Sequence, residues 1–402
     1  MNRLWVSFWT GSALLTLSAA ELPEEHGKAP QPSPYARWQK GPSADESYFP
    51  IAVWLQNPRN AARYKDAGIN LYVGLWRGPT RQQLQELAAA GLQVICEQNR
   101  TALEDVDNRT IVGWMHGDEP DNAQALPGRD GYGPPIPTEK IRKEYEELQA
   151  KDPTRPILLN LGQGVAWDNY IGRGVRRNHP EDYPEYVKGC DIASFDIYPV
   201  VHDSPEIAGK LEMVAHGVER LGQWAGPTRI TWNCIECTHI SRPPAKATPD
   251  QIRSEVWMAL IHGSRGLIYF VHQFKPTFNE AALLDDPLTL TAVTAINRQI
   301  HALAPVLNGP TLAGELTIQS APSTGEGRGL AAMVKRRGSS TYVFTVNLQN
   351  RAVSANLVLK SIKGDRGVIV LDEGRTVPSH EGAFTDQFKP YEVHLYQVRQ
   401  DG

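Results

Sequence analysis

The fold is decided by INLYVGLW at residues 69–76, TRQQLQELAAAG at 80–91 and LQVICE at 92–97. The first and third segments are short apolar runs rich in Val, Ile, Leu and aromatic residues, a composition typical of buried strands. Between them, Thr80 is a helix N-cap residue type, Leu84 and Leu87 share one helix face, and Gly91 suits a helix C-terminus. These three segments predict one β–α–β unit.

The same alternation repeats from about residue 48 to 310, and eight strand segments can be counted. Eight strands separated by helices favour a closed barrel over an open sheet, so we predict an α/β fold with a (β/α)₈ (TIM) barrel at 46–310. After Thr311, alternating apolar and polar runs broken by Gly, Ser and Asn predict an antiparallel β-sandwich at 311–402. The predicted barrel strands are Phe49–Leu55, Ile69–Trp76, Leu92–Glu97, Ile111–His116, Pro156–Asn160, Asp191–Tyr198, Thr228–Cys234 and Gly266–His272.

The N-terminus carries the pattern of a secretory signal. Arg3 precedes a short apolar stretch, and Ser18-Ala19-Ala20 offer the small residues at which a signal peptidase cleaves. We therefore expect a signal peptide at 1–20, a flexible leader rich in Pro, Glu, Lys and Ser at 21–45, and a secreted or periplasmic protein. No membrane insertion is expected after the signal is removed.

Composition excludes several classes of function. The 41 Lys and Arg nearly balance the 45 Asp and Glu, for a net charge of -4 without long runs of either sign, so nucleic acid is not an expected partner. The pair Cys234 and Cys237 has no second pair to complete a zinc site, and the histidines show no ligand spacing. We expect neither a metal nor a cofactor, and the sequence indicates no oligomeric state.

Polar residues close the strands at the end where such barrels hold their active sites. Strand four is followed by Asp118, Glu119 and Asp121, and strand seven by Glu236. Strands four and seven face each other across an eight-stranded ring, so Glu119 and Glu236 can point into one site. Two carboxyl groups on either side of a bond are what glycoside hydrolysis requires, so we predict these two as the catalytic pair.

Other strand ends carry groups suited to binding a sugar. Aromatic faces pack against the C–H surfaces of sugar rings, although each aromatic could equally belong to the core. Tyr198 could donate a hydrogen bond to a nucleophilic carboxylate and keep it ionised, although a purely structural role is an equal alternative. The predicted substrate-binding residues are Asp118, Tyr198, Asp196, Trp54, Trp76, Asn160, Trp232 and His272.

Four motifs together resemble the clan A glycoside hydrolases. They are Gly117-Asp-Glu-Pro120, Asp191-Ile-Ala-Ser-Phe-Asp-Ile-Tyr-Pro199, Glu236, and Ala259-Leu-Ile-His-Gly263 before Gly266-Leu-Ile-Tyr-Phe270. The resemblance covers most of 48–398 as scattered short motifs. It implies hydrolysis of β-glycosidic bonds in a poly- or oligosaccharide by retaining double displacement. Glu119 would be the acid/base and Glu236 the nucleophile, about 5 Å apart, and Tyr198 would orient Glu236.

One departure from that pattern keeps two alternatives open. The clan usually has Asn before its acid/base, and here the residue is Asp118. Adjacent Asp118 and Glu119 resemble hexosaminidases in which the acetamido group of the substrate is the nucleophile. In that scheme Glu236 need not attack the sugar. A barrel that binds a glycan through its aromatic residues without cleaving it is the third alternative.

Overall fold

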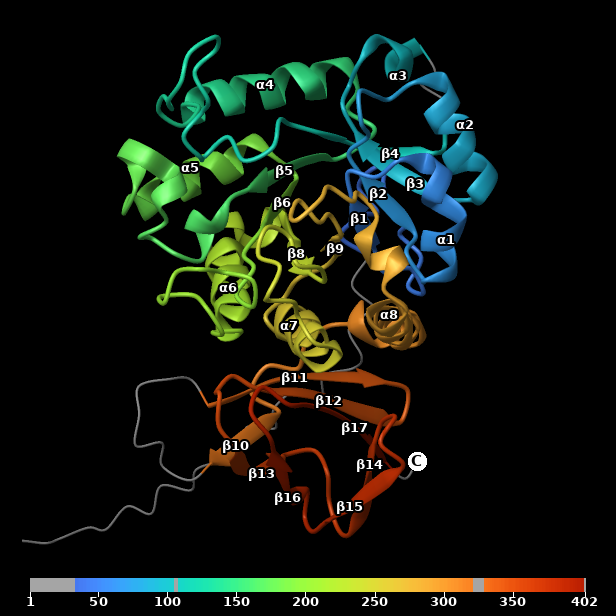
Figure 1. Cartoon of the computed structure of the whole chain (residues 1–402). Helices are drawn as coiled ribbons and strands as arrows, with labels where there is room; N and C mark the ends of the chain where they lie inside the picture. Colours follow the sequence, from blue (N-terminus) through green and yellow to red (C-terminus); the bar gives the residue numbers. More distant parts are fainter. Residues whose placement is uncertain (1–32, 105–107, 321–328, 401–402) are drawn as a thin grey trace, which may run out of the picture. The chain divides into compact units, whose positions relative to one another are not determined.

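The computed structural model describes residues 33–104, 108–320 and 329–400. The predicted signal peptide and residues 21–32 of the leader lie outside the described residues. In the described chain, parallel strands form one sheet in the order β7-β6-β5-β4-β3-β2-β1-β9-β8 (Figure 1). The end strands β7 and β8 are two halves of the predicted seventh strand, interrupted at Trp232, so the sheet closes on itself. The predicted (β/α)₈ barrel is confirmed.

The elements of the barrel follow the predicted order closely. The strands are β1 (Ile51–Trp54), β2 (Leu71–Val73), β3 (Gln93–Cys96), β4 (Ile111–Met115), β5 (Ile157–Leu161), β6 (Ile192–Phe195), β7 (Ile230–Thr231), β8 (Asn233–Glu236) and β9 (Leu267–Phe270). The helices are α1 (Ala61–Asp66), α2 (Arg81–Ala90), α3 (Arg100–Glu104), α4 (Thr138–Lys151), α5 (Tyr183–Tyr186), α6 (Glu212–Ala225), α7 (Pro249–Ile261) and α8 (Pro287–Leu307). Short 3₁₀ turns link them at Pro58–Asn60, Gln163–Val165, Ile171–Arg176, Pro180–Asp182, Val187–Gly189, Gly226–Thr228 and Ala282–Asp285.

Local sequence explains where the helices begin and end. The Thr80 hydroxyl accepts a hydrogen bond from the Gln83 backbone N–H at 3.2 Å, and the Gln83 side chain accepts one from Thr80 N–H at 2.9 Å. Thr248 and Gln251 form the same reciprocal cap at the start of α7. Gly91 ends α2 with φ 65°, a conformation that costs glycine little. These caps satisfy backbone donors that a helix start leaves unpaired.

The C-terminal region folds as two antiparallel sheets, as predicted. One sheet has the order β10-β13-β16 and the other β11-β12-β17-β14-β15. Their facing side chains share a core that includes Val343, Leu357, Phe384 and Tyr396. The strands are β10 (Leu316–Ser320), β11 (Leu330–Arg337), β12 (Ser340–Asn347), β13 (Val353–Leu359), β14 (Arg366–Val370), β15 (Arg375–Ser379), β16 (Ala383–Phe388) and β17 (Val393–Arg399).

These sheets pack against the barrel through α7 and α8, which lie beside β11 and β12 (Figure 1). The rings of Trp257 and Phe344 stack with centroids 5.2 Å apart, and both side chains are fully buried. The Arg253 guanidinium donates a hydrogen bond to the Val393 carbonyl at 3.1 Å. The barrel and the β-domain therefore share one core cluster.

The prediction of a flexible leader is wrong for residues 33–45. Tyr35 is 2% exposed and belongs to the cluster that fills the barrel interior. Its hydroxyl accepts a hydrogen bond from Trp232 Nε1 and donates one to the Arg265 carbonyl, both at 2.8 Å. Arg37 also donates a hydrogen bond to the Thr228 carbonyl at 2.6 Å, and the Lys40 N–H donates one to the Thr154 carbonyl at 3.0 Å, so several contacts hold this segment against the barrel.

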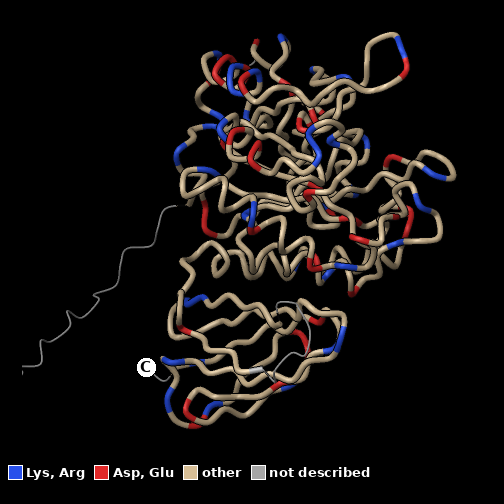
Figure 2. The backbone as a smooth tube through the Cα atoms, turned by 90° about the vertical axis from the view of Figure 1, so that its left-hand side faces the viewer, with Lys and Arg blue, Asp and Glu red and all other residues tan. Residues whose placement is uncertain are grey.

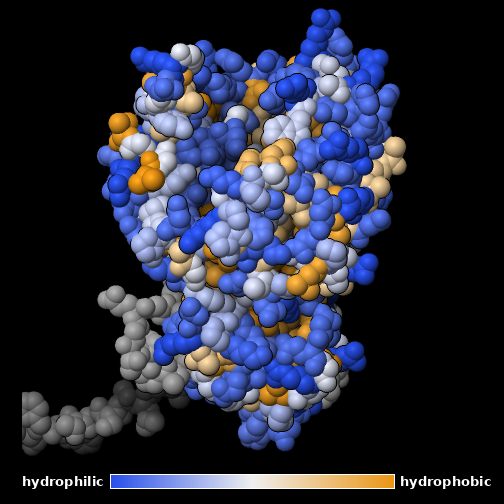
Figure 3. Space-filling view, viewed as in Figure 1, coloured by the Kyte–Doolittle hydropathy of each residue, from blue (hydrophilic) through white to orange (hydrophobic). Residues whose placement is uncertain are grey.

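Charged side chains of both signs are interspersed over the molecule, as the near-neutral composition predicts (Figure 2). The view in Figure 3 is mostly hydrophilic and is interrupted by separate apolar areas. Within the described residues, no helix is long and apolar enough to span a membrane.

Candidate active site

The carboxyl ends of β4, β5 and β6 bring four predicted residues together. The Glu119 backbone N–H donates to the Asn160 carbonyl and the Asp196 N–H donates to the Leu161 carbonyl, both at 3.1 Å. Asp118 lies beside Glu119, and its Oδ1 accepts a hydrogen bond from Asn160 Nδ2 at 2.9 Å. Parallel strands end on one side of the sheet, so residues up to 78 positions apart in sequence become neighbours here.

Glu119 is held in an unusual backbone conformation. Its φ of 44° lies in the left-handed region, which non-glycine residues seldom occupy and which functional sites often contain. Asn122 Nδ2 donates a hydrogen bond to Glu119 Oε2 at 2.8 Å. The strained turn and this hydrogen bond fix the direction of a half-buried carboxyl group at the barrel mouth.

The carboxyl groups of Glu119 and Asp196 interact directly and titrate together. Burial, followed by the charge of Asp118, raises the pKa of Glu119 to about 7. Burial and the charge of Glu119 raise the pKa of Asp196 well above its usual range. Within this pair Asp196 therefore holds its proton in preference to Glu119, and Glu119 is the acid poised to give one up.

Asp118 differs from this pair because it is exposed at the barrel mouth. The surrounding chain still removes part of the water around its carboxyl group, and this desolvation raises the pKa of Asp118 to about 6. The hydrogen bond from Asn160 acts in the opposite direction. Asn160 is itself fixed, since its Oδ1 accepts a hydrogen bond from Ser194 Oγ at 2.7 Å. Asp118 is thus an oriented carboxylate that a ligand can reach.

The third acid of the same segment, Asp121, has a structural environment. It is fully buried, accepts a hydrogen bond from the Gly162 N–H at 2.9 Å and accepts another from the Tyr183 hydroxyl at 2.9 Å. Its carboxyl group ties the loop after β4 to the segment after β5.

Glu236 has hydrogen-bond partners of its own, which differ from those of these acids. Its side chain has no exposed surface, and its two oxygens accept hydrogen bonds from the backbone N–H groups of Val200 at 2.6 Å and Val201 at 3.0 Å. Its carboxyl partner is Glu255 on α7, and burial raises the pKa of Glu236 to about 7 and that of Glu255 well above its usual range. Among the described residues, no hydrogen bond joins Glu236 to Glu119. The expected pairing of Glu119 with Glu236 across the mouth therefore stays a prediction, whereas the burial of Glu236 and the hydrogen bonds to both of its oxygens are features of the structure.

Tyr198 lies with the Glu119 group rather than with Glu236. Its ring packs on Phe270 with centroids 5.2 Å apart, and the charges of Asp196 and Glu119 act on its hydroxyl. The hydrogen bonds that Tyr198 was expected to supply to Glu236 come instead from backbone two and three residues further on.

The predicted aromatic residues divide between the core and the rim. Trp54 is 5% exposed and Trp232 is fully buried. Trp232 occupies the barrel interior beside Tyr35, so the prediction that it contacts substrate is wrong. It lies between β7 and β8, and its side chain points into the barrel instead of toward the mouth. Trp76 is 39% exposed, and its ring lies 5.7 Å from that of buried His272.

Several further residues line the rim that were not predicted from the sequence. Phe274 and Phe278 are exposed and extend the aromatic contact of Trp76 and His272, with Phe278 6.4 Å from Trp76. Tyr170, from the segment after β5, lies close enough to Glu119 for that charge to raise its pKa. Phe274, Phe278 and Tyr170 lie in long loops that carry no periodic pattern. Asn122, which was also not predicted, follows Glu119 by three residues, and this spacing could have indicated it.

One cysteine contacts the site, since Cys234 Sγ donates a hydrogen bond to Asn160 Oδ1 at 3.8 Å. All four cysteines are buried and unpaired, so Cys234 and Cys237 are not bridged. Across residues 33–104, 108–320 and 329–400, no group of three or more His, Cys, Asp or Glu side chains is arranged to hold a metal ion.

No protein-family model matches the chain, and no curated protein matches its sequence. Solved structures do share its fold. An α-amylase from Geobacillus thermoleovorans, solved with acarbose, is 10% identical with a TM-score of 0.53, covering 89% of this chain and 99% of its own. A noncanonic maltogenic α-amylase from Thermotoga neapolitana is 9% identical with a TM-score of 0.52, covering 89% and 99%. A putative α-galactosidase from Bacteroides fragilis is 12% identical with a TM-score of 0.51, covering 89% and 80%. The chain therefore shares the fold of these TIM-barrel glycoside hydrolases over 89% of its length.

Proposed function

We propose that the protein is a glycoside hydrolase in which Glu119 is the general acid. The observation that carries this proposal is the Glu119 carboxyl at the barrel mouth, whose pKa is raised to about 7 by burial and by Asp118. A carboxylic acid that keeps its proton near neutral pH can protonate the oxygen of a leaving group. This reaction class is supported by the structural neighbours, which are α-amylases and a putative α-galactosidase.

The second catalytic group in this proposal is Asp118 rather than Glu236. A nucleophile must reach the anomeric carbon, and Glu236 is fully buried with both oxygens bonded to backbone N–H groups. Asp118 is exposed, oriented by Asn160 and adjacent to the acid. This arrangement favours the substrate-assisted scheme over double displacement on Glu236.

In that scheme the substrate is a sugar with a 2-acetamido group. The acetamido oxygen attacks the anomeric carbon, the bond to the leaving group breaks, and Glu119 gives its proton to the departing oxygen. Asp118 orients the acetamido N–H and stabilises the positive charge of the cyclic intermediate. Glu119 then takes a proton from the water that attacks the anomeric carbon, which restores the acetamido group and the acid.

The rim aromatics supply the apolar part of this site. Trp76 and Phe278 present exposed ring faces, and such faces bind the C–H surfaces of sugars. Because Phe carries no polar group, this part of the rim suits the less polar face of a sugar or an apolar leaving group.

The test is release of the aryl alcohol from aryl glycosides of both anomeric configurations, with and without a 2-acetamido group. Wild-type protein is expected to cleave at least one acetamido glycoside. Glu119→Gln should lower kcat/KM by about 10²–10⁴-fold on substrates with poor leaving groups and by less on those with good ones, because only poor leaving groups need a proton. The matched control is Glu139→Gln, an exposed glutamate at the start of α4. Binding of a glycan by wild-type protein without cleavage of any substrate would contradict the proposal and favour a barrel that binds a glycan without cleaving it.

A further inference from the structure

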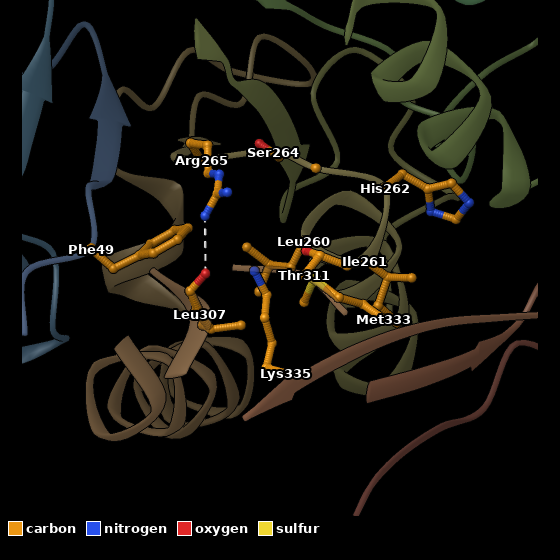
Figure 4. A pocket seen from close by; sticks show the side chains of 11 residues that line it. Phe49, Leu260, Ile261, His262, Ser264, Arg265, Leu307, Thr311, Met333 and Lys335 are labelled. Carbon is orange, nitrogen blue, oxygen red and sulfur yellow. Dashed lines mark hydrogen bonds between the residues drawn. The ribbon is translucent and has the colours of Figure 1, made fainter. Parts of the chain in front are cut away.

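A cavity lies where the C-terminal ends of α7 and α8 meet β11, beside the residues that precede β1 and β9 (Figure 4). Its volume is about 260 Å³. Since a water molecule occupies about 30 Å³ in the liquid, the cavity is large enough for a small organic molecule. Its apolar walls include Phe49, Leu260, Leu307 and Met333.

Two cationic side chains end in this cavity. Lys335 on β11 is 1% exposed, and its Nζ donates one hydrogen bond to the Gly309 carbonyl at 2.5 Å. Arg265, which follows α7, donates from one guanidinium nitrogen to the Leu307 carbonyl at 3.0 Å. Figure 4 shows both charged groups directed into the space between the walls. Each has further N–H donors beyond the one that is used.

The charges around the cavity do not balance. No Asp or Glu is among its lining residues, all of which the structure describes. Below about pH 7, where Lys335 is protonated, the C-termini of α7 and α8 each contribute about half a negative charge against two positive side chains, which leaves about one positive charge. Burial and the charge of Arg265 lower the pKa of Lys335 to about 7, as expected where a negative partner is lacking.

The other titratable groups nearby do not supply that partner. His262 is turned away in Figure 4, and burial lowers its pKa. Arg337, also on β11, is exposed and pairs with Glu46. The Tyr35 hydroxyl donates to the Arg265 carbonyl, and burial keeps that hydroxyl neutral.

We propose that this cavity binds a small monocarboxylate, with the carboxylate between Lys335 and Arg265 and a short apolar body against Phe49, Leu307 and Met333. A single negative charge matches the single unbalanced positive charge, whereas a phosphate dianion exceeds it. The site is separate from Glu119 and does not depend on the proposed reaction.

The test uses full-length protein with sodium acetate, butyrate or phosphate as probes, at ionic strength held constant with chloride. Butyrate should raise Tm saturably and bind in calorimetry, more tightly than acetate because its longer body contacts the apolar walls. Lys335→Gln keeps a donor for the Gly309 carbonyl and removes the charge, so it should weaken butyrate at least about tenfold. Lys360→Gln, at an exposed lysine, and Glu119→Gln should bind as wild type does.

Affinity should also fall as pH rises above about 7, because Lys335 then loses the proton that the bound carboxylate requires. Equal binding by wild type and Lys335→Gln, phosphate binding as tight as butyrate, or the absence of any saturable response would overturn the proposal.

Discussion

At the scale of single residues, the site depends on how three neighbouring carboxyl groups divide their protons. Asp196 is buried, which raises its pKa well above the usual range, Glu119 is half-buried with a pKa near 7, and Asp118 is exposed with a pKa near 6. Sequence position indicated that Asp118, Glu119 and Asp196 lie at strand ends. It could not show which acid each would face, because that depends on backbone turns such as the positive φ of Glu119.

This division predicts a bell-shaped pH profile for kcat/KM. Activity needs Glu119 protonated, so it should fall as pH rises through about 7, and it needs Asp118 ionised, so it should fall as pH drops through about 6. In Asp118→Asn the alkaline limb should move to lower pH, since the charge that raises the pKa of Glu119 is gone.

Asp196 offers a matched pair of controls for that profile. Asp196→Asn keeps a hydrogen-bond donor facing Glu119 and should leave the alkaline limb in place. Asp196→Ala removes the donor, so the limb should move to higher pH. If the alkaline limb of the kcat/KM profile stays at the wild-type pH in both Asp118→Asn and Asp196→Ala, the titrating acid is not Glu119.

At the scale of elements, Glu236 anchors the segment that follows β6 to the end of β8. Its bonds to the Val200 and Val201 N–H groups hold the chain directly after Tyr198, which packs near Asp196. We interpret Glu236 as a positioning residue. The sequence placed it correctly at a strand end, but strand order alone does not determine whether such a side chain points at substrate or at a neighbouring loop.

The buried pair Glu236 and Glu255 predicts a pH-dependent stability. Both pKa values are raised on folding, so the native state favours the protonated forms. The free energy of unfolding should therefore fall as pH rises from about 4.5 through about 7. Glu255→Gln removes one of the two acids and leaves a donor for Glu236, so it should stabilise the protein at pH 8 relative to pH 5, by about 1–3 kcal/mol. Urea unfolding at the two pH values measures this, and equal effects at both would contradict it.

Tyr35 shows the limit of reading elements from composition. The polar, Pro-rich stretch before the barrel has no periodicity. Its Tyr35 nevertheless packs in the cluster inside the barrel and accepts a hydrogen bond from Trp232. Barrel strands and capped helices were predictable because they repeat a local pattern. The single aromatic side chain of Tyr35 repeats no local pattern, so its place in the barrel interior was not predictable from the sequence.

At the scale of the whole molecule, the barrel and the β-domain form one structural unit. Fully buried Trp257 and Phe344 stack across the boundary within one core cluster. The predicted boundary near residue 310 marks a change of fold and not a flexible link.

This shared core predicts that the two parts unfold together. Phe344→Ala should lower the free energy of unfolding by about 3–5 kcal/mol and lower Tm in a single transition seen by both near- and far-ultraviolet circular dichroism. The matched control is Phe278→Ala, at an exposed rim residue, which should leave Tm nearly unchanged. Two separate transitions in wild type would contradict the single unit.

The central claim is that Glu119 works with Asp118 and not with Glu236. It is tested most directly by comparing Asp118→Asn and Glu236→Gln, each with its Tm measured, on a pair of aryl glycosides that differ only in the 2-acetamido group. The account predicts that wild type cleaves the acetamido substrate, that Asp118→Asn loses about 10²–10⁴-fold in kcat/KM, and that folded Glu236→Gln stays within about tenfold. Cleavage of the substrate that lacks the acetamido group, together with loss of that activity in Glu236→Gly and its rescue by azide, would contradict the account.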